Sequence, residues 1–73
     1  MIYRLDRETA CGSKSSVWNG ATLPSAQSRM QECIDELTTE LERSGWGVRW
    51  YQTEHGATVY WANSHVHFNI YER

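Results

Sequence analysis

Residues 46–71 constrain the fold most, because they alternate apolar and polar side chains through three short runs separated by two turn signals. The segment also holds seven of the nine aromatic residues of the chain. Alternation with period two is typical of half-buried strands, and glycine in the pair His55-Gly56 suits a hairpin turn. A second turn is expected at Asn63-Ser64. The pattern therefore predicts an antiparallel meander with strands at residues 46–54, 57–62 and 65–71.

Closing both turns assigns a register and divides the side chains between two faces. Tyr51 is expected opposite Tyr60, and Tyr60 opposite His67. Both hairpins agree on the division, which a slip of one residue would reverse. The face expected to pack on a helix holds Trp46, Val48, Trp50, Val59, Trp61, Val66, Phe68 and Ile70. The opposite face holds Arg49, Tyr51, Thr53, Thr58, Tyr60, His65, His67, Asn69 and Tyr71.

Residues 24–44 predict one amphipathic helix. Pro24 suits the first helical turn, and Gly45 lies where a left-handed residue commonly ends a helix. This ending makes Leu41 and Trp46 the pair of residues whose contact accompanies a Schellman cap. The apolar stripe follows helical spacing and consists of Ala26, Met30, Cys33, Ile34, Leu37 and Leu41.

Residues 1–7 alternate loosely and predict a further strand, whereas the polar, glycine- and serine-rich residues 8–22 predict a loop. We expect a single α+β domain over residues 1–73, in the order β-α-β-β-β. One helix would pack on one face of a mostly antiparallel four-stranded sheet. The 1–7 strand is expected at an edge of this sheet, and the pattern does not say which edge. Free sheet edges in so small a chain favour a homodimer.

Charge and cysteine content narrow the classes of function. The formal net charge of −2 disfavours direct nucleic-acid binding, which usually needs a basic surface. Residues 1–7 lack the apolar segment of a secretion signal, and no run is long enough to span a membrane. We therefore expect a cytoplasmic protein in which Cys11 and Cys33 are reduced thiols, although whether the two ever pair stays open.

A protein-binding surface is the functional interpretation that the pattern favours. Tyrosine, histidine and arginine on an exposed sheet face combine contact area with polar groups, as interfaces require. Glu32, Glu36 and Glu40 form an acidic row that could dock on a basic partner. Trp18 is either a lid on the core or an exposed anchor. The candidate binding residues are Tyr51, Tyr60, His65, His67, Tyr71, Trp18, Glu32, Glu36 and Glu40.

We expect a non-enzymatic protein-binding module that acts as an inhibitor. A small, mildly acidic chain without a catalytic motif is typical of proteins that phages and mobile elements direct against host machinery, including nucleic-acid-guided defence complexes. No catalytic residue is assigned under this hypothesis.

Two rival functions use the same sheet face. A small ribonuclease toxin would use His67 as general acid or base, Arg49 to hold the phosphate and Tyr60 to assist. This set lacks a second base. A nucleic-acid-binding module would instead stack bases on Tyr51, Tyr60 and Trp18.

No cofactor or metal site is expected. His65 and His67 share a face, but His55 occupies the turn at the far end of the predicted sheet. No cysteine or carboxylate is placed to join His65 and His67 as a ligand.

Overall fold

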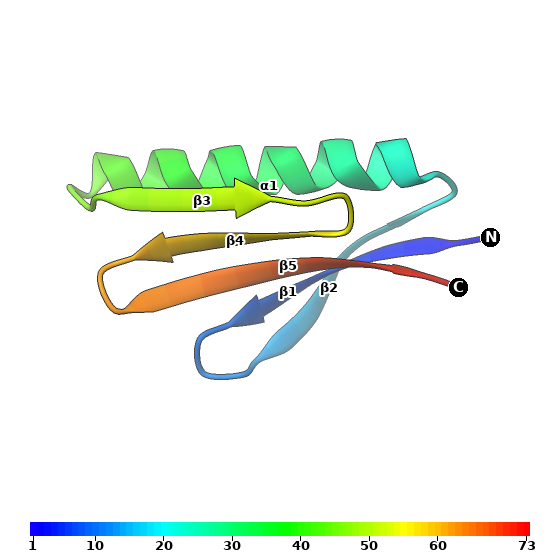
Figure 1. Cartoon of the computed structure of the whole chain (residues 1–73), viewed down its shortest axis with the longest axis horizontal. Helices are drawn as coiled ribbons and strands as arrows, with labels where there is room; N and C mark the ends of the chain where they lie inside the picture. The colour runs from blue at the N-terminus through cyan, green and yellow to red at the C-terminus, as the bar shows by residue number, and fades with distance from the viewer.

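The computed structural model describes all 73 residues of the chain. It contains one helix, α1 (Leu23–Arg43), and five strands: β1 (Tyr3–Thr9), β2 (Lys14–Gly20), β3 (Val48–Gln52), β4 (Gly56–Trp61) and β5 (Ser64–Glu72). The strands form one antiparallel sheet in the order β2-β1-β5-β4-β3 (Figure 1). The predicted α+β architecture, with one helix packed on an antiparallel sheet, is confirmed. The predicted number of four strands is wrong, because the sheet has five.

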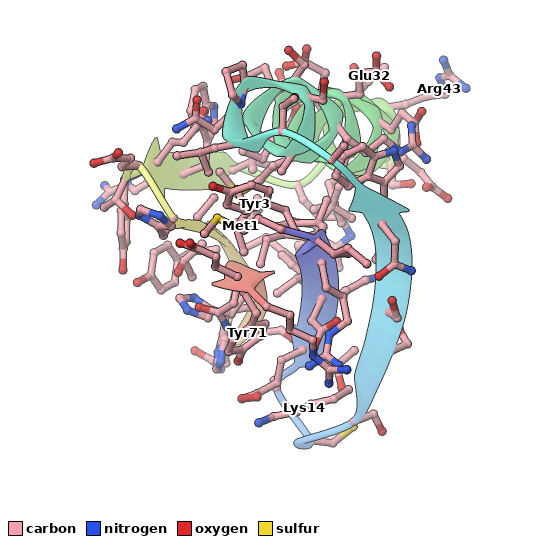
Figure 2. All side chains as sticks on the ribbon, turned by 90° about the vertical axis from the view of Figure 1, so that its right-hand side faces the viewer. Met1, Tyr3, Lys14, Glu32, Arg43 and Tyr71 are labelled. Atoms are coloured by element: carbon pink, nitrogen blue, oxygen red, sulfur yellow. The ribbon has the colours of Figure 1, made fainter.

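The sheet curves around the helix. Figure 2 looks along α1 and shows β2 on one side of it and β3 on the other. The helix contacts all five strands. One sheet face is therefore packed on the helix, and the opposite face, which we call the outer face, is turned to solvent. The structure contains no helix with the length and apolar character that crossing a membrane requires.

The additional strand, β2, lies within residues 8–22, where a loop was predicted. A tight turn joins it to β1. In this turn Gly12, with φ of 89°, donates its N–H to the carbonyl of Thr9, and Thr9 donates to the carbonyl of Ser13. Most side chains of this edge strand are exposed, so folding does not require them to alternate between apolar and polar. A β-bulge in its pairing with β1 disturbs the period further.

Strand β1 lies inside the sheet, between β2 and β5, and not at an edge as predicted. Leu5 is fully buried opposite both Trp18 of β2 and Ile70 of β5. β2, the strand that was not predicted, therefore pairs with the side of β1 that was expected to be a free edge.

The helix begins and ends within one residue of the predicted bounds. Thr22 caps its N-terminus, and Pro24 lies in the first turn. At the other end Gly45 has φ of 90°, and the N–H of Trp46 donates to the carbonyl of Leu41 over 3.1 Å. This bond is the one that a Schellman ending makes, as predicted.

Both predicted hairpin registers are wrong by two residues. Tyr51 lies opposite Thr58 and not Tyr60, and Tyr60 lies opposite His65 and not His67. A shift of two residues keeps each side chain on its face, because the strand period is two. The predicted division into two faces therefore holds, while the predicted neighbours across the strands do not.

The two turns cause this shift. The first turn lies at Glu54 and His55, one residue earlier than predicted, and is closed by a hydrogen bond from the N–H of Thr53 to the carbonyl of Gly56 over 2.7 Å. The second turn lies at Ala62 and Asn63, one residue earlier than predicted. Ala62 adopts a left-handed φ of 48°, which alanine rarely does, so the residue types gave no signal for the position of the turn.

The core lies between α1 and the concave sheet face. Trp46 and Trp50, predicted to be buried, are 48% and 47% exposed. Trp50 belongs to the edge strand β3 and Trp46 to the link that precedes it, so neither has neighbours on all sides. Trp61 is half-buried against the core. The buried apolar residues are Leu5, Ala26, Met30, Ile34, Ala57, Val59, Val66, Phe68 and Ile70.

Candidate protein-binding surface

The outer face of β3, β4 and β5 carries the tyrosine and histidine side chains that the sequence predicted there. Tyr51 and Tyr60 lie with their ring centroids 6.0 Å apart, and Tyr60 and His65 with theirs 6.3 Å apart. Arg49 completes the row, because it lies opposite Tyr60. We call these four residues, Arg49, Tyr51, Tyr60 and His65, the aromatic patch. Its two tyrosines are 49% and 42% exposed.

A buried hydroxyl organises the patch from beneath. Thr58 is only 3% exposed although it lies on the outer face. Its Oγ1 donates to the hydroxyl of Tyr51 over 3.4 Å and lies 2.5 Å from Nδ1 of His67. Hydrogen bonds from Thr58 and Tyr60 lower the pKa of Tyr51, whereas the bond to Tyr51 raises the pKa of Tyr60. The hydroxyl of Tyr51 therefore has a fixed hydrogen-bond donor in Thr58.

Strand β1 adds a charged area to the outer face. Nε of Arg4 lies 2.9 Å from Oδ1 of Asp6, and the guanidinium of Arg4 lies 5.3 Å from the ring centroid of Tyr71. Glu8 pairs with Lys14 over 3.3 Å. Figure 2 shows Lys14 and Tyr71 on the side of the sheet away from the helix.

Arg4, Asp6 and Glu8 were not predicted on the binding face, because the strands that neighbour β1 could not be assigned from the sequence. The sequence did contain a signal for their position, because these three residues are spaced two apart and so share one face of a strand. With β1 docked beside β5, this alternation assigns all three to the outer face.

A shallow hollow of about 770 Å³ surrounds the edge strand β3. From the helix side it is lined by Trp50 and Trp61, and from the outer face by Arg49, Tyr51 and Tyr60. The hollow therefore connects the aromatic patch with the exposed indole of Trp50 around the free edge of the sheet.

The acidic row lies on the helix, away from the outer face. Glu32 is neutralised in part by Arg29, whose Nη1 lies 2.8 Å from its carboxylate. Glu36 and Glu40 make no ion pair and line a second shallow hollow together with Arg43. In Figure 2 Glu32 lies on the opposite side of the molecule from Tyr71. The row and the aromatic patch therefore form two separate surfaces.

Trp18 lies on the helix side of the sheet, packed against the core and across Gly20. This position agrees with the interpretation as a lid. Trp18 does not share a surface with Tyr51 and Tyr60, so the three predicted stacking residues of a nucleic-acid-binding module are not brought together.

Two arrangements bear on catalysis and metal binding. Glu8, whose carboxylate pairs with Lys14, lies directly opposite His67 in the register of β1 and β5. No group of three or more His, Cys, Asp or Glu side chains is gathered in a way that could hold a metal ion.

The two cysteines are free and differ in environment. Cys11 lies exposed in the turn between β1 and β2, where hydrogen bonds from Thr9 and Ser13 lower its pKa to about 7. Burial against the helix side of the sheet raises the pKa of Cys33.

A comparison of the chain with known protein families, characterised proteins and solved structures finds no match.

Proposed function

We propose that the chain is a non-enzymatic protein-binding module whose contact surface is the aromatic patch on β3, β4 and β5. The observation that carries this proposal is the contiguity of Tyr51, Tyr60 and His65, whose rings are neighbours across three strands. Single exposed aromatic residues are ordinary on protein surfaces, whereas contiguous apolar area marks interaction sites.

The chemistry of the patch fits a protein partner. Tyrosine and arginine are enriched among the residues that dominate interface energetics. The hydroxyl of Tyr51 accepts a hydrogen bond from Thr58, and its ring lies beside that of Tyr60. Side chains that are already ordered lose less conformational entropy on binding, which favours affinity.

The proposal extends to an inhibitor that covers a basic surface of a host complex, such as a phage-encoded protein acting on nucleic-acid-guided defence. Glu36 and Glu40 support this extension, because both are exposed and neither has an ion-pair partner. Complementary charge of this kind steers association and suppresses wrong partners.

Affinity capture from cells that carry the gene tests the proposal and its extension. Wild-type protein is expected to retain a defined partner, and Tyr60→Ala to lose it. Asn19→Ala, at an exposed position of the opposite edge strand β2, serves as the control and should retain it. Loss on Glu36→Lys would support a basic partner surface, whereas retention on Tyr60→Ala would refute the role of the patch.

A metal-independent ribonuclease is the second candidate, and the position of Glu8 opposite His67 favours it. Glu8 would accept the proton of the ribose 2′-hydroxyl as its oxygen attacks phosphorus. His67 would donate a proton to the departing 5′-oxygen, which leaves a 2′,3′-cyclic phosphate. Expression that arrests growth and degrades RNA, both abolished by Glu8→Gln and by His67→Ala, would establish this activity. Intact RNA in cells that express the wild-type chain would exclude it.

A further inference from the structure

Along the free edge of β3, every second residue directs its backbone N–H and C=O groups away from the sheet. In an antiparallel pair, successive residues direct their N–H and C=O groups alternately toward the partner strand and away from it. The bond from Thr53 to Gly56 directs odd-numbered residues toward β4. Val48, Trp50 and Gln52 therefore direct their N–H and C=O groups outward, where no strand receives them.

The two edges of the sheet are not equally protected. β2 carries Lys14 and contains a bulge in its register with β1. Both devices hinder pairing with another strand. β3 has neither lysine nor proline, carries Arg49 as its one charged residue, and pairs with β4 without interruption. Four of its five residues are exposed, including Trp50. The β3 edge is therefore the less protected of the two, because it has one charge and no bulge.

We propose that two copies of the chain pair antiparallel through their β3 edges, around a twofold axis at Trp50. Each Trp50 lies opposite its counterpart, Val48 lies opposite Gln52 of the second copy, and Arg49 lies opposite Tyr51 of the second copy. The pairing joins the two sheets into one and occupies the outward amides of all three even-numbered residues.

Two features select this register: the outward direction of the backbone amides of the even-numbered residues, and the side chains that the register places opposite one another. Only registers that place even-numbered residues opposite one another satisfy the outward amides. Pairing Val48 with Trp50 would use three residues of each strand and set Arg49 against Arg49, which places like charges opposite. Pairing Trp50 with Gln52 would again use only three residues. The register centred on Trp50 uses all five.

Complementary side chains support a second copy as the occupant of this edge. Arg49 and Tyr51 would form pairs without mutual backbone bonds, the geometry in which side chains come closest. Twofold symmetry creates two such arginine–tyrosine contacts for each dimer. The same pairing places the aromatic patches of both copies side by side on one continuous outer face. The dimer does not depend on the proposed partner binding.

Sedimentation equilibrium on the purified chain tests the association. Wild type is expected to dimerise, and Trp50→Lys to sediment as a monomer. Arg49→Ala removes two cation–π contacts, so we expect its dimer dissociation constant to rise about fivefold to thirtyfold. Ser16→Lys, on the other edge, is the control and should leave dimerisation unchanged. A wild-type monomer throughout the accessible concentration range would overturn the proposal.

Disulfide trapping tests the register in a Cys11→Ser, Cys33→Ala background. Opposed Trp50 residues would have Cα atoms about 5.5 Å apart, within the range that a disulfide bridges. Trp50→Cys should therefore form a covalent dimer, whereas Arg49→Cys should not. Cross-linking of Arg49→Cys without that of Trp50→Cys would refute the register. Circular dichroism of each variant confirms that it is folded before it is compared.

Discussion

Thr58 lies 2.5 Å from Nδ1 of His67 and also donates to the hydroxyl of Tyr51, so one buried hydroxyl connects three strands beneath the aromatic patch. The neighbouring position on β5, His65, lies beside Tyr60 with ring centroids 6.3 Å apart. The outer face is therefore an ordered layer of side chains and not a set of independent surface groups.

Removing this hydroxyl should raise the pKa of Tyr51. The hydrogen bond from Thr58 stabilises the phenolate and is the largest cause of the lowered pKa. We expect Thr58→Val to shift the pKa of Tyr51 upward, toward its usual value, and Thr58→Ser to keep it low. Titration of the Tyr51 ring carbon by NMR measures both. An unchanged pKa in Thr58→Val would contradict the hydrogen bond.

Cys11 should react as a thiolate near neutral pH, whereas Cys33 should not. Hydrogen bonds from Thr9 and Ser13 lower the pKa of Cys11 to about 7, and burial raises that of Cys33. Alkylation by iodoacetamide, followed by peptide mass spectrometry across pH, should therefore show half-maximal modification of Cys11 near pH 7. Thr9→Val should move this midpoint upward. Equal profiles for the two thiols would show that the turn does not perturb Cys11.

Core truncation should be more destabilising at a methionine than at a tryptophan. Met30 is fully buried, whereas Trp46 is 48% exposed. We expect Met30→Ala to lower the free energy of unfolding by about 2–5 kcal/mol, and Trp46→Ala to lower it by less. Urea denaturation measures both changes. A larger loss for Trp46→Ala would favour the buried position that the sequence predicted.

The end of α1 depends on the left-handed conformation of Gly45. Its φ is 90°, and a Cβ at this position would meet no atom within 4 Å, so any loss comes from backbone strain alone. We expect Gly45→Ala to lower the unfolding free energy by about 1–2 kcal/mol. Gly47→Ala is the matched control, because Gly47 also has open space around it but no positive φ. Equal losses in the two variants would argue against the predicted strain.

The helix and the two sheet faces could be predicted from sequence because their signals are local and periodic. Pro24, Gly45 and the apolar stripe mark the helix, and alternation assigns Tyr51 and Tyr60 to one face whatever the register. The register itself depends on loop geometry. The left-handed φ of Ala62 moved one turn by a residue and gave each tyrosine a different neighbour.

The sequence pattern did not predict which strands form the edges of the sheet. Strand β2 has no period that distinguishes it from a polar loop, because it is an exposed edge with a bulge. Missing β2 left β1 without a position, so Glu8 was not recognised as the neighbour of His67. The position of β3 at the sheet edge also explains why Trp50 is not buried. Its apolar character predicted burial, but β3 has a neighbouring strand on one side only.

Site-specific photo-cross-linking tests the role of the aromatic patch most directly. A photoreactive phenylalanine analogue replaces Tyr60 in one variant and Asn19, exposed on the opposite edge strand β2, in another. Both are expressed in cells that carry the gene and irradiated, and the adducts are identified by mass spectrometry. We predict that position 60 yields an adduct with a defined second protein, distinct from the chain itself, and that position 19 does not. Equal labelling at the two positions, or adducts of position 60 with the chain alone, would contradict a partner-binding patch.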